Sequence, residues 1–225
     1  MIYYIDRIIN KIILILTIIF VFLGLYSLYD SYPIYDEIKN TEKVKIYNPI
    51  ISDEYINKNI IGWIKIDNTI IDYPILQGKD NNTYLSLNYK DEYSFSGSIF
   101  LDYRNNSDFS DDMNIIYGHN MSYKIMFSEL KYYKDKKYFK THNKGKLYIK
   151  DNTYDINILL YKEVNENDDI PYNLYLYRNN YNKKIYKTLM NKKGNINKIL
   201  ILSTCKKGNK NKRIILVCEL NKIEV

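Results

Sequence analysis

The stretch Lys198-Ile-Leu-Ile-Leu-Ser-Thr-Cys205 ends on a cysteine, and a second apolar run, Arg213–Ile223, begins eight residues later. Two runs of branched apolar residues separated by a short polar segment predict antiparallel strands joined by a hairpin loop. In that pairing Thr204 lies near Arg213. The stretch therefore predicts a thiol at a strand end, with a fixed cation close to it.

A disulfide between Cys205 and Cys218 is the alternative use of this thiol, because exported proteins often carry disulfides. In the predicted hairpin, Cys218 faces residue 199 or 200. At roughly 3.3 Å per residue, it then lies well over 10 Å from Cys205, beyond the reach of a disulfide. We predict that Cys205 is a free thiol and that Cys218 is a small buried apolar residue.

Short runs rich in β-branched and aromatic residues recur from Ile60 onward, with polar turns between them. The runs that predict further strands are Ile60–Ile66, Thr69–Leu76, Ser98–Leu101, Asn114–Tyr117, Lys146–Lys150 and Tyr154–Val164. Short helices are predicted at Asn81–Leu87, at Met126–Leu130 and, in the crossover before the cysteine strand, at Tyr181–Met190. So many short strands favour a mainly β fold closed into a barrel.

The loop Asn105–Asp112 is rich in Asp and Asn, which raises the question of a calcium site. The loop lacks the Gly and the terminal Glu of an EF-hand. We therefore expect a solvated loop, no metal site and no cofactor.

Residues Ile12–Tyr29 carry no charge and would span roughly 27 Å as a helix, about one bilayer core. A cleavable signal peptide is the alternative, but the end of this segment lacks a small-x-small cleavage site. Arg7 and Lys11 precede the segment and acidic residues follow it, so the N-terminus is expected in the cytoplasm. We predict an uncleaved, single-pass membrane anchor.

Three regions are expected from this pattern. Residues 1–29 form a cytoplasmic stub and the transmembrane anchor, and residues 30–59 form a helical linker in which Pro33 and Pro49 break the helices. Residues 60–225 form one extracellular domain.

The 225-residue chain has a formal net charge of +7, which raises the question of an anionic partner. It contains no zinc-finger spacing, no RNP-like aromatic string and no dense arginine cluster, so we expect no nucleic-acid partner. Outside a membrane, anionic wall polymers or lipid head groups fit the charge better. Simple solvation by lysine is the plainest interpretation.

The segment Tyr117-Gly118-His119-Asn120 supplies a histidine upstream of the cysteine strand. A thiol that attacks an amide needs a group that handles protons and a group that stabilises the developing oxyanion. His119 can provide the first and Arg213 the second.

Together these residues resemble the sortases, cysteine transpeptidases of Gram-positive cell surfaces, from about Ile60 onward. The elements that carry the resemblance are Asp72–Gln77, Gly97–Asn105, Tyr117–Met121, Met126-Phe127 and Leu202–Cys205 with Arg213. Class B is favoured, because its members resemble this chain in their extra N-terminal helices and in a helix within the crossover. The resemblance implies a mixed eight-stranded β-barrel with short helices.

The resemblance also implies roles for individual residues. Cys205 would be the nucleophile, His119 the general acid and base, and Arg213 the donor to the oxyanion or substrate carbonyl. The residues implied in the peptide groove are Asp72, Leu76, Ile170 and Ser203.

One departure from the family pattern follows the nucleophile. Some class B enzymes carry an acidic residue directly after the cysteine, whereas Lys206 and Lys207 stand here. No carboxylate therefore stands next to Cys205 in the sequence to assist the reaction.

The implied reaction cleaves a C-terminal sorting signal of exported surface proteins, NPxTN-like or PxTG-like, through an acyl-enzyme on Cys205. The acyl group would pass to an amine of a peptidoglycan precursor, either lipid II or a stem peptide. Two alternatives stay open. The domain could be a non-catalytic, membrane-tethered module that binds a peptide or cell-wall polymer, or water could resolve the thioester so that hydrolysis dominates.

Overall fold

The computed structural model describes residues 2–46, 57–121, 124–150, 152–174, 198–206 and 208–223. The chain divides into two compact units, Met1–Lys43 and Val44–Val225. The helix predicted at Tyr181–Met190, together with Pro49 and Lys207, lies outside the described residues.

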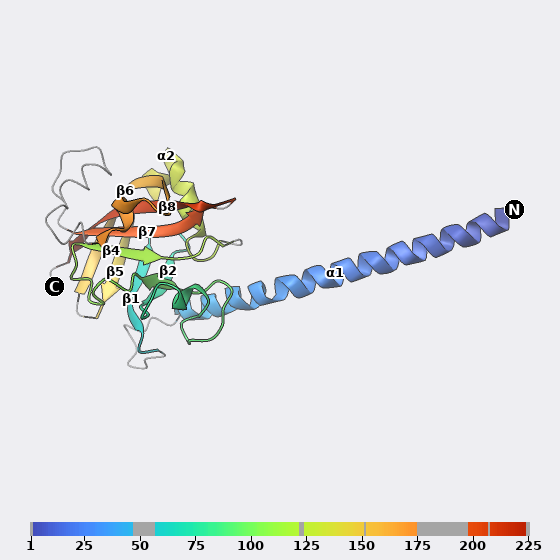
Figure 1. Ribbon diagram of the computed structural model, residues 1–225, viewed down its shortest axis with the longest axis horizontal. Helices are drawn as coiled ribbons and strands as arrows, with labels where there is room; N and C mark the ends of the chain where they lie inside the picture. The colour runs from blue at the N-terminus through green and yellow to red at the C-terminus, as the bar shows by residue number, and fades with distance from the viewer. Residues whose placement is uncertain are drawn as a thin grey trace. The chain divides into compact units, whose positions relative to one another are not determined.

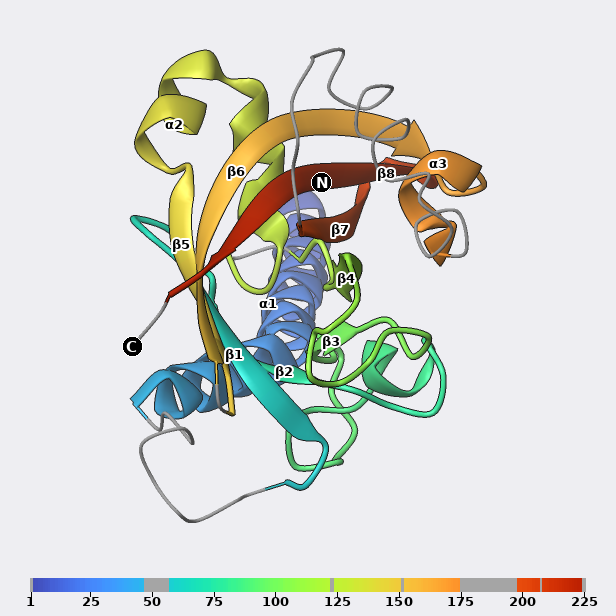
Figure 2. The ribbon, with the colours of Figure 1, turned by 90° about the vertical axis from the view of Figure 1, so that its left-hand side faces the viewer.

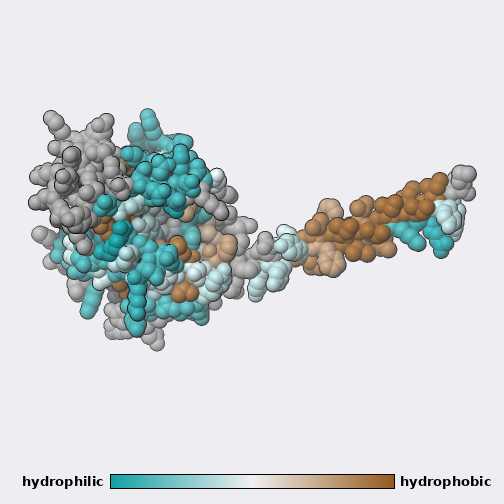
Figure 3. Space-filling model, in the orientation of Figure 1, coloured by the Kyte–Doolittle hydropathy of each residue, from teal (hydrophilic) through white to brown (hydrophobic). Residues whose placement is uncertain are grey.

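The first unit is formed by the long helix α1, Ile2–Ile46 (Figure 1). Its stretch Tyr3–Tyr29 is long and apolar enough to cross a membrane, and Figure 3 shows apolar residues along most of that stretch. The prediction that Pro33 breaks the helix is wrong. Proline lacks the N–H that would bond to the Tyr29 carbonyl. That carbonyl lies at the end of the apolar stretch Tyr3–Tyr29.

The second unit is a closed barrel of eight strands in the order β1-β2-β3-β4-β7-β8-β6-β5 (Figures 1 and 2). The strands are β1 Ile60–Ile66, β2 Asp72–Leu76, β3 Ile99–Leu101, β4 Met113–Tyr117, β5 Lys144–Ile149, β6 Asn152–Asn165, β7 Ile199–Lys206 and β8 Asn209–Lys222. The β2–β3 and β4–β7 pairs are parallel and the other neighbours are antiparallel. The predicted mixed eight-stranded barrel is confirmed.

Short helices connect the strands. They are the 3-10 helices η1 Thr83–Leu85 and η2 Ser128–Lys134 and the α-helices α2 Lys136–Thr141 and α3 Asp169–Tyr172. The helix predicted at Asn81–Leu87 is therefore present as η1, whereas the one predicted at Met126–Leu130 begins two residues later.

The turn between β1 and β2 is longer than predicted. We expected a strand over Thr69–Leu76, but β2 begins at Asp72. The Thr69 hydroxyl donates to the carbonyl of Ile66 over 2.9 Å and accepts from the N–H of Ile71 over 3.1 Å. A threonine side chain thus satisfies main-chain groups that a longer strand would have paired.

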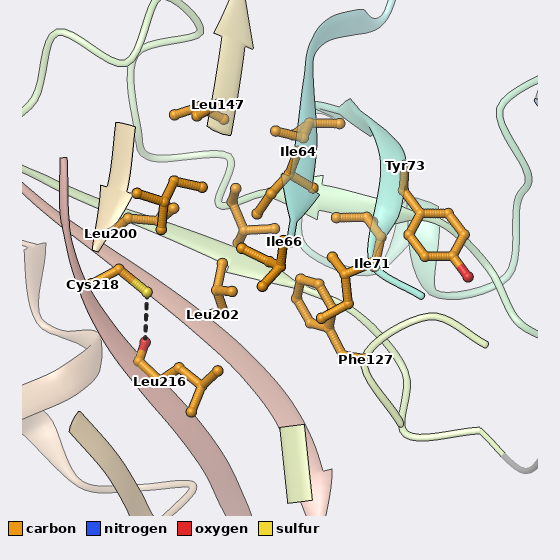
Figure 4. Packing of buried hydrophobic residues seen from close by; sticks show 14 of the residues in the cluster. Ile64, Ile66, Ile71, Tyr73, Phe127, Leu147, Leu200, Leu202, Leu216 and Cys218 are labelled. Carbon is orange, nitrogen blue, oxygen red and sulfur yellow. Dashed lines mark hydrogen bonds between the residues drawn. The ribbon is translucent and has the colours of Figure 1, made fainter. Parts of the chain in front are cut away.

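The barrel interior is filled by aliphatic side chains from alternate strand positions, because successive residues of a strand point to opposite faces. Figure 4 shows Leu200 and Leu202 of β7 beside Leu216 and Cys218 of β8. Cys218 is fully buried and opposes Leu200, as predicted, and burial raises the pKa of its thiol. Both cysteines are free thiols, as predicted.

A second apolar cluster lies on the outer face of the β4–β7–β8–β6 strands. Its buried members are Met113, Ile115, Val164, Leu174, Ile199, Ile201, Ile215 and Val217. Tyr172 of α3 packs against it, so the described start of the β6–β7 crossover covers part of this face. The predicted catalytic residues lie at the end of the same face.

Candidate active site

Cys205 lies near the end of β7, directly opposite Arg213 of β8. Residues that oppose each other in antiparallel strands point to the same face of the sheet. Cys205 is exposed, whereas the Arg213 side chain is 25% exposed. An accessible thiol and a largely buried guanidinium therefore share the outer face of the barrel.

His119 reaches the same site from β4, which runs parallel to β7. Tyr117 is in register with Ser203, and the next N–H, that of Gly118, donates to the Ser203 carbonyl over 3.2 Å. β4 ends at Tyr117, two residues before His119. The next residue, Asn120, links this segment to β7, because its side-chain amide donates to the Cys205 carbonyl over 2.8 Å.

The His119 ring is oriented by a main-chain carbonyl. Its Nε2 atom lies 2.8 Å from the carbonyl oxygen of Leu85 in η1. A carbonyl oxygen can only accept, so Nε2 must carry hydrogen. In the neutral ring Nδ1 is then the acceptor nitrogen.

The residue before His119 has to be glycine. A Cβ atom on Gly118 would lie 2.4 Å from Cδ1 of Ile99 and 2.9 Å from Cδ2 of Phe127, both inside contact distance. Phe127 is held there because its N–H donates to the His119 carbonyl over 3.0 Å. Close packing beneath Gly118 thus sets the path of the chain into His119.

Two ion pairs flank the hairpin that carries the thiol. Nη2 of Arg213 donates to Glu166 over 2.8 Å, and Nζ of Lys206 donates to Glu163 over 2.5 Å. The hydrogen bond from Lys206 lowers the pKa of Glu163. Both carboxylates come from the end of β6 and the turn after it.

A buried carboxylate anchors the strand that leads to His119. Asp102 is fully buried and accepts from Tyr117 over 2.9 Å and from Arg104 over 2.7 to 3.0 Å. Burial alone would raise the Asp102 pKa, but the hydrogen bonds and charge of Arg104 outweigh it, so the pKa lies below its usual range. Tyr117 is fixed in this way two residues before His119.

Two of the predicted groove residues align with the catalytic strand ends. Ser203 is buried, and its Oγ lies 3.0 Å from the Tyr172 hydroxyl of α3. Leu76 is fully buried and pairs in register with Phe100 of β3. Phe100 pairs with Tyr117 of β4, which in turn pairs with Ser203. Ser203 contacts the start of the crossover, whereas Leu76 packs with Tyr84 and Phe100.

The other two predicted groove residues are placed differently. Asp72 lies four residues from Leu76 along β2, roughly 13 Å at the strand rise, and contacts Trp63 over 2.6 Å and Lys65 over 3.0 Å. The structure therefore does not bring Asp72 together with Leu76. Ile170 belongs to α3, and its side chain lies outside the described part of the structure.

An open cavity of about 430 Å³ lies where the crossover begins. It is lined by Arg104, Glu166, Asn167, Asp168, Tyr172 and Asn173. Two of these lining residues contact the predicted site: Glu166 accepts a hydrogen bond from Arg213, and the Tyr172 hydroxyl contacts Ser203.

Sequence reasoning did not assign roles to Asn120, Glu166 or Tyr172, although all three contact residues of the predicted site. The sequence offers a signal for Asn120, because this residue directly follows His119 in the same motif. Glu166 and Tyr172 carry no local signal, since their contacts depend on strand register and on the path of the crossover.

Comparisons with known proteins identify the family that this chain resembles. A family model described as the sortase domain matches residues 64–221. Sortase B of Staphylococcus aureus is 32% identical over 179 residues, which cover 76% of this chain and 73% of the relative. Sortase B of Listeria monocytogenes is 53% identical over 87 residues, which cover 39% of this chain and only 35% of that relative.

Solved structures show the same fold. A Staphylococcus aureus sortase B–substrate complex has a TM-score of 0.73 at 26% identity, covering 84% of this chain and 98% of the other. Sortase B of Clostridium perfringens has a TM-score of 0.64 at 32% identity, covering 75% and 96%. A sortase B complexed with triglycine also matches, with a TM-score of 0.73 at 27% identity, covering 84% and 99%.

Proposed function

This chain belongs to the sortase family, within class B of these cysteine transpeptidases, and on that premise we propose that Cys205, His119 and Arg213 carry its reaction. The observation that supports the assignment is the register of three strands, β4, β7 and β8. Cys205 of β7 opposes Arg213 of β8 directly, and β4, which pairs with β7, ends two residues before His119.

In the proposed first half-reaction, Sγ of Cys205 attacks the carbonyl carbon of a peptide bond in the sorting signal. Arg213 donates to the oxygen that becomes negative. The thiol proton of Cys205 passes to His119, which gives a proton to the departing amine, and an acyl-enzyme thioester remains on Cys205. The exposure of Cys205 and the orientation of His119 through Leu85 support these roles.

In the second half-reaction, an amine attacks the thioester carbon and His119 accepts its proton. A new amide forms and the Cys205 thiol is restored. We propose that the acyl donors are exported surface proteins with an NPxTN-like or PxTG-like signal. The proposed acceptor is a peptidoglycan-precursor amine, on lipid II or on a stem peptide.

The peptide groove is proposed to run along the outer face beneath the crossover. Ser203, Leu76 and Ile170 remain its proposed lining, and the contact between Ser203 and Tyr172 supports this location. The contacts of Asp72 with Lys65 and Trp63 favour a structural role at the far end of β2.

The proposed location is the cell membrane, with the N-terminus in the cytoplasm and the catalytic domain outside. The apolar stretch Tyr3–Tyr29 supports the anchor, and Arg7 and Lys11 near its start support the orientation. Protease added to intact protoplasts should then remove the domain. Protection of the domain until lysis would contradict this orientation.

The reaction can be tested with the full-length chain in detergent and fluorogenic peptides that carry each signal. Wild-type protein should cleave one of them and gain the mass of an acyl fragment, and Cys218→Ala should do the same. Cys205→Ala should do neither. Cleavage by Cys205→Ala at the wild-type rate, with no adduct on the wild type, would exclude the proposed nucleophile.

A second arm separates transfer from hydrolysis. Adding triglycine or diaminopimelate to the same reaction should yield a ligated peptide that grows with the amine concentration. If only hydrolysed product forms at every concentration, the transpeptidase description is wrong for these acceptors.

A further inference from the structure

A carboxylate on the turn after β6 contacts the Arg213 guanidinium. Nη2 of Arg213 donates to Oε2 of Glu166 over 2.8 Å, and the two side chains are 25% and 36% exposed. A partly buried pair is screened by salt less than a surface pair. Arg213 is also the residue proposed to donate to the developing oxyanion.

The strand register explains how Glu166 reaches this position. Val164 of β6 opposes Arg213 of β8, and Cys205 of β7 opposes Arg213 from the other side. Glu166 lies in the turn directly after β6, two positions past Val164. Diagonal neighbours of this kind lie within reach of long side chains.

The turn that carries Glu166 is tied down by its main chain. The Glu166 N–H donates to the Asn211 carbonyl over 2.9 Å, which links the turn to the start of β8. The Asp168 carboxylate accepts from the Asn165 N–H over 2.8 Å, which closes the turn itself. The Glu166 carboxylate is therefore presented from a fixed backbone.

The lysine that follows the nucleophile contacts a different carboxylate. Lys206 is one residue past Cys205, where the β7–β8 register shifts, and pairs with Glu163, three residues before Glu166. The carboxylate beside Arg213 thus comes from β6 and the turn after it, not from the position after the nucleophile.

We propose that Glu166 is a positioning residue that holds the Arg213 guanidinium on the Cys205 face. The inference rests on the proposed function. A guanidinium carries five N–H donors, so the bond from Nη2 to Glu166 and the longer one from Nη1 to the Lys212 carbonyl are compatible with donation to a substrate oxygen. Fixing the group beforehand means that less freedom is lost when the oxyanion forms.

The first test measures acylation of the full-length chain by a cleavable signal peptide. Glu166→Gln should lower kcat about tenfold with little change in KM, as expected for a loss of oxyanion stabilisation. Glu166→Asp should recover part of the rate. Glu163→Gln is the matched control, because the Lys206–Glu163 pair is similarly exposed, at 35% and 25%, and should stay within about twofold of wild type.

Two results in this assay overturn the proposal. One is a wild-type kcat for Glu166→Gln. The other is an equal loss of kcat in Glu163→Gln, which would show a general effect of charge near the hairpin. Thermal unfolding of each variant identifies any loss that comes from instability.

The second test measures the contact between Arg213 and Glu166 without an activity assay. Phenylglyoxal modifies accessible guanidinium groups, and peptide mass mapping reports the rate at Arg213. The rate should rise severalfold in Glu166→Gln and stay unchanged in Glu163→Gln. If wild-type protein forms no acyl-enzyme with any peptide, the proposed function fails. Equal Arg213 rates in wild type and Glu166→Gln overturn the role of Glu166 in either case.

Discussion

The side-chain amide of Asn120 donates a 2.8 Å hydrogen bond to the main-chain carbonyl of Cys205, 85 positions away in the chain. The bond joins the segment that carries the proposed general acid and base to the strand that carries the proposed nucleophile. It acts on the spacing of the two segments, because it involves neither the His119 ring nor the thiol.

Replacing Asn120 by alanine should slow acylation with little effect on folding. One hydrogen bond contributes about 1 kcal/mol, and the misalignment of His119 and Cys205 should lower kcat about tenfold. Pre-steady-state cleavage of a signal peptide measures the change. The exposed amide of Asn221 provides a control, and a wild-type rate for Asn120→Ala would show that the bond has no part in alignment.

The two cysteines should differ sharply in reactivity. Iodoacetamide should modify the exposed Cys205 in the folded protein, whereas Cys218 is buried and burial raises the pKa of its thiol. Cys218 should react only after denaturation. Mass spectrometry of wild type and Cys205→Ala separates the two sites, and comparable labelling of Cys218 in the native state would contradict the packing.

Asp102→Asn should destabilise the domain by about 1–3 kcal/mol, the cost of weakening a buried, charge-assisted acceptor. The Asp102 pKa is lowered in the folded state, so its contribution is complete above the unfolded value of about 3.9. The contribution disappears as the pH falls through the folded value.

Urea unfolding at pH 7 and at pH 3 measures both effects. The gap between wild type and Asp102→Asn should narrow at pH 3. Asp155→Asn is the control, because Asp155 pairs with Lys146 at an exposed site and should cost less than about 1 kcal/mol. If the difference in free energy of unfolding between wild type and Asp102→Asn is the same at both pH values, the ionised form of Asp102 does not contribute to stability.

Gly118→Ala should lower both stability and activity. Its methyl group would overlap Ile99 and Phe127, and overpacking of this kind costs about 1–3 kcal/mol. Shortening Ile99 to valine removes the Cδ1 atom that lies 2.4 Å away, so the double variant should regain part of the Tm. An unchanged Tm for Gly118→Ala alone would show that the packing below His119 is loose.

Sequence reasoning was most successful where the signal is local. The alternating run Ile60–Ile66 was predicted at the bounds that β1 has, and the hairpin of β7 and β8 places Cys218 opposite Leu200 as expected. It failed at Pro33, because the helix continues through that residue to Ile46 at the cost of one main-chain hydrogen bond. It overextended β2, because the Thr69 hydroxyl competes for main-chain partners.

The sequence by itself determined the strand-forming segments, the apolar anchor and the residue types of the site, because hydrophobic period and motif spacing are properties of neighbouring residues. Only the tertiary structure decided which of those residues meet. The parallel pairing of β4 with β7 lets Asn120, next to His119, bond to the Cys205 carbonyl, and the pairing of β6 with β8 brings Glu166 to Arg213. Such contacts depend on register between distant strands, which no local pattern encodes.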